Sequence, residues 1–454
     1  MTATMITTFD TRALRQDLAD LVRANIDYMV SRWEAKGRPE WLDTKVDIAT
    51  GMDFATSDRI GTVHGPDVVY GWIQGRGLEA LAGHRRWLGE GADRTAASQG
   101  LIPRLDDCLR RLGTALERRR AEHGRLFFMM RADTGAPLCL DDDGRLAALP
   151  AGDLPPGFTD LFYSKGLAAA GSVLGEASWV QAGSGLFGDT VKAIMAGRFV
   201  SDQQPMDPRN PVRPVPGRLS HGPAMIAIGG TGTLLQITRD AAWWDAGLAL
   251  ARHIVARHIS HGQFDGLQDG DLVEFITPDG APYDSAGAIL CDPGHALEWV
   301  GLTARLLWIG EAVMGRTAAV VAAQEELQTA LLGVFRQAFR IGFNPEAGGI
   351  CKLVDLRTRR VVNGDMPWWS LPETLRAAAL LRRLYPDHAT AAEAALGVCW
   401  QALERYLSPA AGRLAVQTRD AAGRTVAVIP ACPDADPCYH TGLSLIDTWR
   451  ALDR

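Results

Sequence analysis

The chain has 454 residues, of which 47% are hydrophobic and 22% are charged, a balance typical of a soluble globular protein with a large core. This composition excludes a disordered or collagen-like chain, and the formal net charge of −6 provides no positive surface for nucleic acid or an anionic membrane. No apolar run approaches the roughly 18–20 residues that a membrane-spanning helix needs.

The N-terminal segment, Met1 to Arg15, is polar and includes Asp10, which is not the pattern of a secretory signal. We treat residues 1–10 as a candidate disordered terminus. The seven cysteines are scattered, and only Cys432 and Cys438 lie close together, without a partner at the spacing of a zinc site. We therefore expect reduced thiols in a cytoplasmic protein and no bound metal.

Helical periodicity dominates the chain, and few segments alternate β-branched and polar residues. Short strands or hairpins are expected at 125–149, 271–284, 350–362 and 413–429. The expected helices are 11–32, 72–90, 98–123, 159–175, 185–197, 219–236, 240–260, 295–314, 318–341, 368–384, 388–406 and 440–452.

The twelve expected helices alternate in character. Odd-numbered helices are charged and amphipathic, whereas even-numbered ones are apolar on several sides and rich in small residues, as in Gly166–Gly171 and Ala224–Gly230. A helix without a polar face is usually buried on most sides. The alternation predicts an all-α (α/α)6 barrel, with six inner and six outer helices in one domain over 1–454. An open solenoid of helix pairs is the alternative, but no fixed repeat of 33–45 residues supports it.

A Pro-rich segment at 205–217 precedes the sixth helix and can be neither helix nor central strand. It is either a linker between domains or a long ordered loop on the rim of the barrel. We favour the loop, because the alternation of helices continues through it.

Unusual polar residues cluster near the starts of the even-numbered helices. Successive helices of a ring run antiparallel, so all even helices begin at the same end, and we expect these residues to converge on one mouth. Thirteen Trp against seven Tyr also favour a sugar ligand, whose C–H faces pack on aromatic rings. In chain order the residues are Tyr70, Gln74, Arg76, Tyr163, Lys165, His221, Asp292, His295, Glu298, Trp299, Trp369, Glu373, Tyr439 and His440.

The start of the eighth helix carries a candidate base. Asp292 is a good N-cap with proline next, and His295 and Glu298 are three residues apart on one face. Glu298 could accept a hydrogen bond from one ring nitrogen and leave the other as a base, and the positive helix start would keep the imidazole neutral. The plain alternative is a surface His–Glu pair without function.

His440 precedes an apolar helix and is either a buried core histidine or the second member of a pair of neutral imidazoles that exchange protons with a substrate. Arg76, in a helix of low charge, either pairs with a carboxylate such as Glu373 or binds substrate oxygens. Glu373 has the same ambiguity.

Other candidates are weaker. His253, His258 and His261 are interpreted as an exposed face of an outer helix. Gly229-Gly230-Thr231-Gly232 lies inside a helical pattern, which favours close packing over phosphate binding. The chain contains no dinucleotide-binding GxGxxG after a strand, no P-loop and no GxSxG nucleophile elbow.

Four stretches together resemble the N-acylglucosamine 2-epimerase family, which includes cellobiose 2-epimerases and mannose and sulfoquinovose isomerases. They are Trp72–Arg76, Pro293–Trp299, Trp368–Glu373 and Cys438–His440, in an order and separation similar to the family's over roughly residues 40–454. The resemblance implies an (α/α)6 barrel, in agreement with the helix count.

The resemblance also implies roles for these residues. His295 and His440 are the paired acid and base, Arg76 holds the O1/O2 region of the sugar, Glu298 and Glu373 orient histidines and bind hydroxyls, and Trp369 stacks on the sugar. His221 is similar to a further family histidine that serves ring opening, although Leu219-Ser220 precede it where the family has Asn and Met. Tyr70, Gln74, Trp299 and His221 are expected to contact substrate.

We expect a cofactor-independent isomerase or epimerase that abstracts the C2 proton of a free reducing sugar and forms an enediolate, with a simple mannose- or glucose-type aldose favoured. A monomer or homodimer is expected. One alternative is a glycoside or unsaturated-uronide hydrolase on the same barrel that uses Asp292, Glu298 and Glu373. The other is an inactive sugar-binding module.

Overall fold

The computed structural model describes residues 10–54, 62–91, 96–150, 152–204, 206, 215–428 and 432–453. Its α-helices are α1 (Thr11–Ala35), α2 (Gly71–Gly89), α3 (Ala96–His123), α4 (Phe158–Leu174), α5 (Ala177–Met195), α6 (Gly222–Thr238), α7 (Ala242–His258), α8 (Pro293–Met314), α9 (Ala318–Gly342), α10 (Ser370–Leu384), α11 (Thr390–Glu404) and α12 (Leu445–Ala451). A π-helical turn, η5 (Tyr439–Ser444), leads into α12, and 3-10 turns form at Thr62–His64, Pro386–His388 and Pro409–Ala411.

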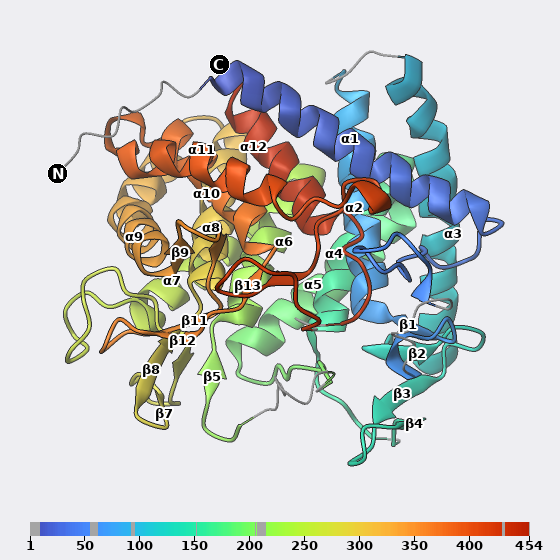
Figure 1. The fold of residues 1–454 in the computed structure, drawn as a ribbon, viewed down its shortest axis with the longest axis horizontal. Coiled ribbons are helices and arrows are strands. Elements are labelled where there is room, and N and C mark those ends of the chain that lie inside the picture. Colours follow the sequence, from blue (N-terminus) through green and yellow to red (C-terminus); the bar gives the residue numbers. More distant parts are fainter. Residues whose placement is uncertain are drawn as a thin grey trace.

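The even-numbered helices form a closed inner ring. Each even-numbered helix packs against the next even-numbered helix, and η5 packs against α2 to complete the circle. The odd-numbered helices lie outside this ring (Figure 1). This arrangement confirms the (α/α)6 barrel and shows that the open solenoid is wrong. The ring closes because the inner helices are apolar on nearly all sides: α6 buries almost every residue from Gly222 to Leu235.

Small residues allow this close packing. A Cβ added to Gly229 would lie 2.7 Å from Leu302, and one added to Gly230 would lie 2.3 Å from the ring of Phe187. The interpretation of the Gly229–Gly232 stretch as a packing surface is therefore confirmed.

Short antiparallel strands decorate the ends at which the inner helices begin, because β1, β5, β8 and β13 directly precede α2, α6, α8 and α10. They form two four-stranded sheets, β1-β2-β3-β4 and β12-β11-β8-β7, and the pairs β5-β6, β10-β9 and β13-β14. The bounds are β1 Val68–Tyr70, β2 Met129–Arg131, β3 Pro137–Leu140, β4 Leu146–Ala148, β5 Leu219–Ser220, β6 Phe275–Ile276, β7 Asp284–Ser285, β8 Ala288–Cys291, β9 Phe343–Asn344, β10 Gly349–Ile350, β11 Leu353–Asp355, β12 Val361–Asn363, β13 Met366–Pro367 and β14 Thr418–Arg419.

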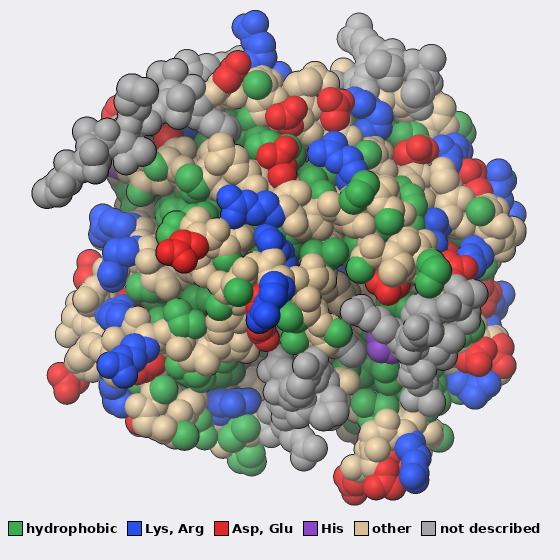
Figure 2. Space-filling model, viewed as in Figure 1, with side chains coloured by type: hydrophobic (Ala, Val, Ile, Leu, Met, Phe, Trp, Pro, Cys, Tyr) green, Lys and Arg blue, Asp and Glu red, His purple; other side chains and the backbone are tan. Residues whose placement is uncertain are grey.

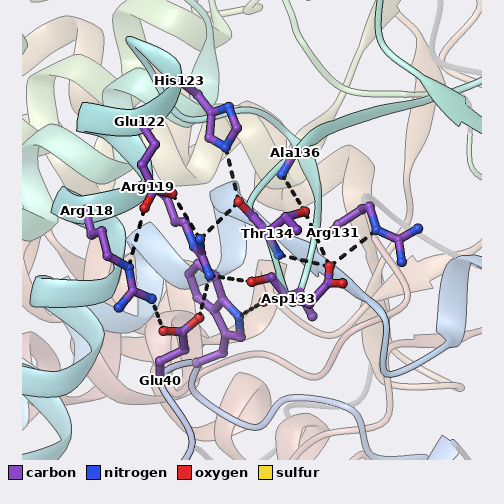
Figure 3. Close-up of polar contacts among 11 residues, drawn as sticks. Glu40, Arg118, Arg119, Glu122, His123, Arg131, Asp133, Thr134 and Ala136 are labelled. Carbon is purple, nitrogen blue, oxygen red and sulfur yellow. Dashed lines mark hydrogen bonds and ion pairs between the residues drawn. The ribbon is translucent and has the colours of Figure 1, made fainter.

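Outer helix α3 shows how the outer layer is tied to these hairpins (Figure 3). The Arg119 guanidinium donates hydrogen bonds to the backbone oxygens of Asp133, at 2.5 Å, and Thr134, at 3.0 Å, in the turn between β2 and β3. It also pairs with Glu40 at 3.0 Å and Glu122 at 2.9 Å. One buried cation thus joins the N-terminal segment, α3 and the hairpin.

Most expected helix ends differ from the structure by one to three residues, and three differences are informative. Helix α5 begins at Ala177 rather than 185, Leu219–Ser220 pairs with β6 instead of opening α6, and a π-helical turn replaces the expected first turn of α12. The second difference reflects pairing with a distant strand, which helical periodicity does not report. Strands occur in all four expected segments, whereas β1, β5, β8, β9 and β13 were not expected.

The remaining expectations concern the surface and the thiols. Residue 205 and residues 207–214 of the Pro-rich segment, and 1–9 of the candidate disordered terminus, lie outside the described residues. All seven cysteines are free thiols, as expected. No helix within the described ranges has the length and apolar character needed to cross a bilayer. Acidic and basic side chains are interspersed on the face drawn in Figure 2.

Candidate active site

The starts of the inner helices bring the candidate residues together. His221 is the N-cap of α6, His295 is the third residue of α8, and Glu373 is the fourth residue of α10. His440 lies in the turn before α12, and Arg76 is one turn into α2. Ring contacts and hydrogen bonds join these positions, as described below, so their convergence on one mouth is confirmed.

The start of α8 has the expected cap. The Asp292 carboxylate accepts hydrogen bonds from the backbone N–H groups of Gly294, at 3.0 Å, and His295, at 3.3 Å. Gly294 has no room for a side chain, because a Cβ there would lie 2.8 Å from the ring of Trp369. The N-cap and the glycine thus fix the start of α8 against the start of α10.

His295 faces two carboxylates. Its Nδ1 lies 3.1 and 3.2 Å from the two carboxylate oxygens of Glu274 and 3.3 Å from Oδ2 of Asp292. Burial alone would lower the pKa of His295, but Asp292 and Glu274 together raise it above its usual value. This shift is opposite in direction to the one expected from the positive helix start, because two carboxylates lie beside the ring.

Glu274 connects two histidines. Its Oε2 also lies 3.3 Å from Nε2 of His221. Burial would raise the pKa of Glu274, but His295 and His221 hold it well below the usual range. The carboxylate is therefore a buried negative charge shared by two imidazoles.

His221 lies against His295, at a ring-centroid distance of 6.1 Å, and is buried. Its side chain is completely enclosed, and its ring packs edge-to-face on His258 at a centroid distance of 5.4 Å. The expected contact of His221 with substrate stays a prediction. The structure corrects the interpretation of His258, which is buried rather than exposed, and whose pKa falls to about 3 through burial and the neighbouring His221.

His440 belongs to a second cluster. Its Nδ1 lies 2.8 Å from Oε1 of Glu373, and the Ser444 hydroxyl donates to the same oxygen at 2.7 Å. Arg376 forms an ion pair with the other oxygen of Glu373. Burial would raise the pKa of Glu373, but Arg376 and His440 lower it. An ionised Glu373 can accept a hydrogen bond from Nδ1–H of His440, and Nε2 is then the ring nitrogen that can face a substrate.

Glu298 is oriented differently from the expectation. Its carboxylate joins the cluster of Glu373 and His440, with the donor atoms of the three residues within 4.8 Å of one another, whereas His295 is oriented by Glu274. Among the described residues the Glu298 carboxylate has no hydrogen-bond partner. Burial and the nearby Glu373 raise the pKa of Glu298. A buried carboxyl group with no hydrogen-bond partner among the described residues is available to substrate oxygens.

Trp369 connects the two clusters. Its ring stacks on His295 at a centroid distance of 5.2 Å and lies 5.9 Å from the ring of His440. Lys352 places its Nζ 5.4 Å from the same ring and pairs with Asp292. Both imidazoles therefore border one aromatic surface, and a cation that was not anticipated lies beside it.

The Arg76 guanidinium is held by aromatic rings. It lies 4.3 Å from the centroid of Phe162, 4.9 Å from that of Trp72 and 5.1 Å from that of Tyr439, the neighbour of His440. Within the described residues no carboxylate pairs with Arg76, and Glu373 pairs with Arg376 instead. Of the two roles left open for Arg76, the structure thus excludes the ion pair with Glu373.

Tyr70, Gln74 and Trp299 are enclosed by the core. Tyr70 and Trp299 have no exposed surface, and the Tyr70 hydroxyl donates to the backbone oxygen of Val63 at 2.7 Å. The Gln74 amide exchanges two hydrogen bonds with the backbone of Leu42. Neighbours in the core cover these three side chains, and their contact with substrate stays a prediction.

Sequence reasoning missed Glu274 and Arg376. Glu274 lies in an apolar stretch between Val273 and Phe275, and Arg376 follows the apolar Leu375 in α10. A charged residue within an apolar segment needs a buried partner, and that signal was available. The identity of the partners was not, because they lie on other elements.

Two groups of side chains have the donor types of a metal site. They are His221, Glu274 and His295, and Glu298, Glu373 and His440. Each group has a cation nearby. Lys352 forms an ion pair with Asp292 beside His295, and Arg376 forms an ion pair with Glu373. These cations disfavour a further positive ion, and the carboxylates of Glu274 and Glu373 are already bonded to imidazoles.

Comparison with known proteins yields matches to sugar-converting enzymes. The sequence model described as N-acylglucosamine 2-epimerase (GlcNAc 2-epimerase) matches residues 167–441, which is more than half of the chain. A D-mannose isomerase of Pseudomonas cannabina pv. alisalensis is 26% identical over 230 residues, or 48% of this chain and 52% of that protein. The chain thus aligns with about half the length of this curated relative.

Two solved structures share the fold over nearly their whole length. A D-mannose isomerase aligns with a TM-score of 0.63 at 14% identity, covering 94% of this chain and 97% of that chain. The cellobiose 2-epimerase of Spirochaeta thermophila DSM 6192 aligns with a TM-score of 0.67 at 14% identity, covering 98% and 99%. At this level of identity the similarity shows the barrel fold alone.

Proposed function

The chain belongs to the N-acylglucosamine 2-epimerase family, and from this premise we propose that it is a cofactor-independent isomerase or epimerase of a free reducing sugar. One observation carries the proposal. Two imidazoles, His295 and His440, border the same ring of Trp369, and each has its Nδ1 bonded to a buried carboxylate. Such a pair can remove a proton and return one within a single bound sugar.

The proposed reaction begins with the open-chain aldehyde. Nε2 of His440 takes the proton from C2, and the C–H bonding electrons form the C1–C2 double bond of an enediolate as the carbonyl electrons move to O1. His295, whose raised pKa favours the protonated ring, then gives a proton back. Delivery to the opposite face of C2 yields the epimer, and delivery to C1, with transfer of the O2 proton to O1, yields the ketose.

Arg76 and Glu298 serve the substrate oxygens in this proposal. The Arg76 guanidinium, which has no carboxylate partner among the described residues, can bond to O1 and O2 and stabilise the charge that develops there. The Glu298 carboxyl group, whose pKa is raised by burial and by Glu373, can exchange a proton with the same oxygens. Trp369 provides the apolar wall on which a sugar ring would pack.

We favour a simple aldose of the mannose or glucose type as the substrate, and the similarity to a D-mannose isomerase supports this choice. An N-acyl sugar and a disaccharide are the competing substrates. The glycoside hydrolase and the inactive binding module are tested by the same experiment.

The test is turnover in deuterated water. The purified chain is incubated with mannose, glucose, cellobiose or N-acetylmannosamine, and the products are followed by NMR. We expect one aldose to give its C2 epimer or its ketose, with deuterium at C2 or C1, because the histidine proton exchanges with solvent. Binding measured by calorimetry without turnover of any of these sugars would indicate an inactive module and contradict the proposal.

A second expected result concerns the pH dependence. In Glu274→Gln the side chain keeps its shape but loses the charge that helps to raise the pKa of His295. The protonated acid is then lost at lower pH, so the basic limb of kcat/KM should move down by about one pH unit or more. A pH profile of both proteins measures this shift.

The control for this profile is Glu326→Gln, which removes an exposed carboxylate paired with Arg252 far from the mouth. Its profile should match that of the unmodified chain. A Glu274→Gln enzyme with an unshifted basic limb would show that His295 is not the acid that the profile reports.

A further inference from the structure

A small polar cavity lies among the inner helices of the barrel. It has a volume of about 50 Å³ and is lined by side chains from all six inner helices and η5. Arg376 and Tyr439 separate it from the catalytic clusters, because Arg376 pairs with Glu373 and Tyr439 adjoins His440. Its outer rim consists of the partly exposed Arg86, Gln236 and Arg450, near the carboxyl ends of α2, α6 and α12.

The charges that line this cavity are unbalanced. The lining contains the cations of Arg86, Lys165, Arg305, Arg376 and Arg450, but only the carboxylates of Glu79 and Asp447. The charge of Glu79 is balanced by Lys165, with which it forms an ion pair at 2.8 Å.

Asp447 is therefore shared by three guanidinium groups. It lies 2.8 Å from Arg305, 3.9 Å from Arg450 and 4.0 Å from Arg376. Arg450 and Arg376 have one further carboxylate each, Glu90 and Glu373, which lie outside the cavity lining.

Arg86 has neutral partners only. Its guanidinium donates to the side-chain oxygen of Gln236 at 3.0 Å and to Ser172 at 3.5 Å, and among the described residues no carboxylate pairs with it. Burial, and then the repulsion of Arg450 and Arg305, lower the pKa of Arg86 to about 10. Glu90 and Glu79 offset part of this shift, but neither pairs directly with Arg86, and a partly buried cation without a paired anion is costly.

We propose that this cavity binds a single small inorganic anion, chloride or a tetrahedral oxyanion, between Arg86, Arg305 and Arg450. The volume suits such an ion, because a water molecule needs about 10–15 Å³ of the same kind of space. Guanidinium groups bind both kinds of anion through several N–H donors. The anion would offset the repulsion among the arginines, so its binding would stabilise the folded barrel independently of any turnover.

Two measurements on the full-length chain test this site. The first is thermal unfolding with increasing chloride, sulfate or phosphate, at an ionic strength held constant with the sodium salt of a bulky organic anion. We expect Tm to rise with at least one of the three ions, and Arg86→Gln to weaken the apparent affinity for that ion by about tenfold or more. The response to each ion separates chloride from the oxyanions.

The matched control is Arg252→Gln, which removes an exposed arginine of outer helix α7 that pairs with Glu326. It should keep the full anion response. Equal stabilisation of Arg86→Gln and the unmodified chain would overturn the proposal, because the anions would then act elsewhere.

The second measurement is a crystal of the unmodified chain soaked in bromide, which needs no variant and no substrate. We expect an anomalous peak within about 3.5 Å of the guanidinium nitrogens of Arg86 or Arg305. A cavity without such a peak, together with anion-independent Tm values, would mean that water and the helix carboxyl ends alone balance these arginines.

Discussion

Replacing His440 by alanine should lower kcat by at least about 10²-fold, with a much smaller change in KM. The variant removes the nitrogen that takes the C2 proton, and it leaves Glu373 held by Arg376 and Ser444, so the remaining site keeps its shape. His295→Ala should lose a similar factor through loss of the proton donor. Steady-state rates of sugar conversion measure both effects.

The control for these two variants is the replacement of a histidine that lies outside the site. His261 is exposed, and its nearest acidic partner, Asp269, is exposed as well, so His261→Ala should retain full activity. Retained activity in His440→Ala or His295→Ala would remove that residue from its role. Release of a reducing end from a glycoside, unaffected by His440→Ala, would favour the carboxylate-based hydrolase instead.

Replacing Arg76 by alanine should lower kcat/KM by about 10²- to 10³-fold, because the developing enediolate charge would lose its principal cation. Arg76→Lys should recover only part of this loss. An ammonium keeps the charge, but it lacks the planar fork that can bond to O1 and O2 together. Rates measured for the three proteins over a range of sugar concentrations separate kcat from KM.

The structural contribution of Arg76 is controlled by measuring thermal unfolding of the same variants, since its guanidinium also packs on Phe162, Trp72 and Tyr439. Arg111, half exposed on outer helix α3, provides the matched substitution, and Arg111→Ala should leave the kinetics unchanged. A loss confined to KM in Arg76→Ala would mean that the guanidinium binds the sugar without stabilising the enediolate.

The convergence of the site was predictable because it depends on periodicity. Helices that alternate between amphipathic and wholly apolar character predict two layers, and antiparallel neighbours predict that all inner helices begin at one end. Asp292 followed by proline similarly located the start of α8 within two residues. These features are local, so the order of residues along the chain is sufficient to determine them.

The partners of the histidines were not predictable in the same way. The three-residue spacing places Glu298 on the same face of α8 as His295, but the carboxylate bonded to His295 comes from Glu274, which directly precedes β6. Tyr70, Gln74 and Trp299 also occupy the expected helix starts, yet their side chains are covered by the core. Helical spacing specifies a face, whereas a hydrogen bond depends on distances of about 3 Å.

The sequence by itself thus determined the barrel, the end of the barrel that carries the site and most of the residues near it. The tertiary structure alone decided which carboxylate bonds each histidine, that the pKa of His295 rises, and that Arg76 has no carboxylate partner among the described residues. Charges interact over a few ångströms in a dry interior, and those separations are set by loops and by the rotation of whole helices. Neither is encoded in the spacing of residues within one element.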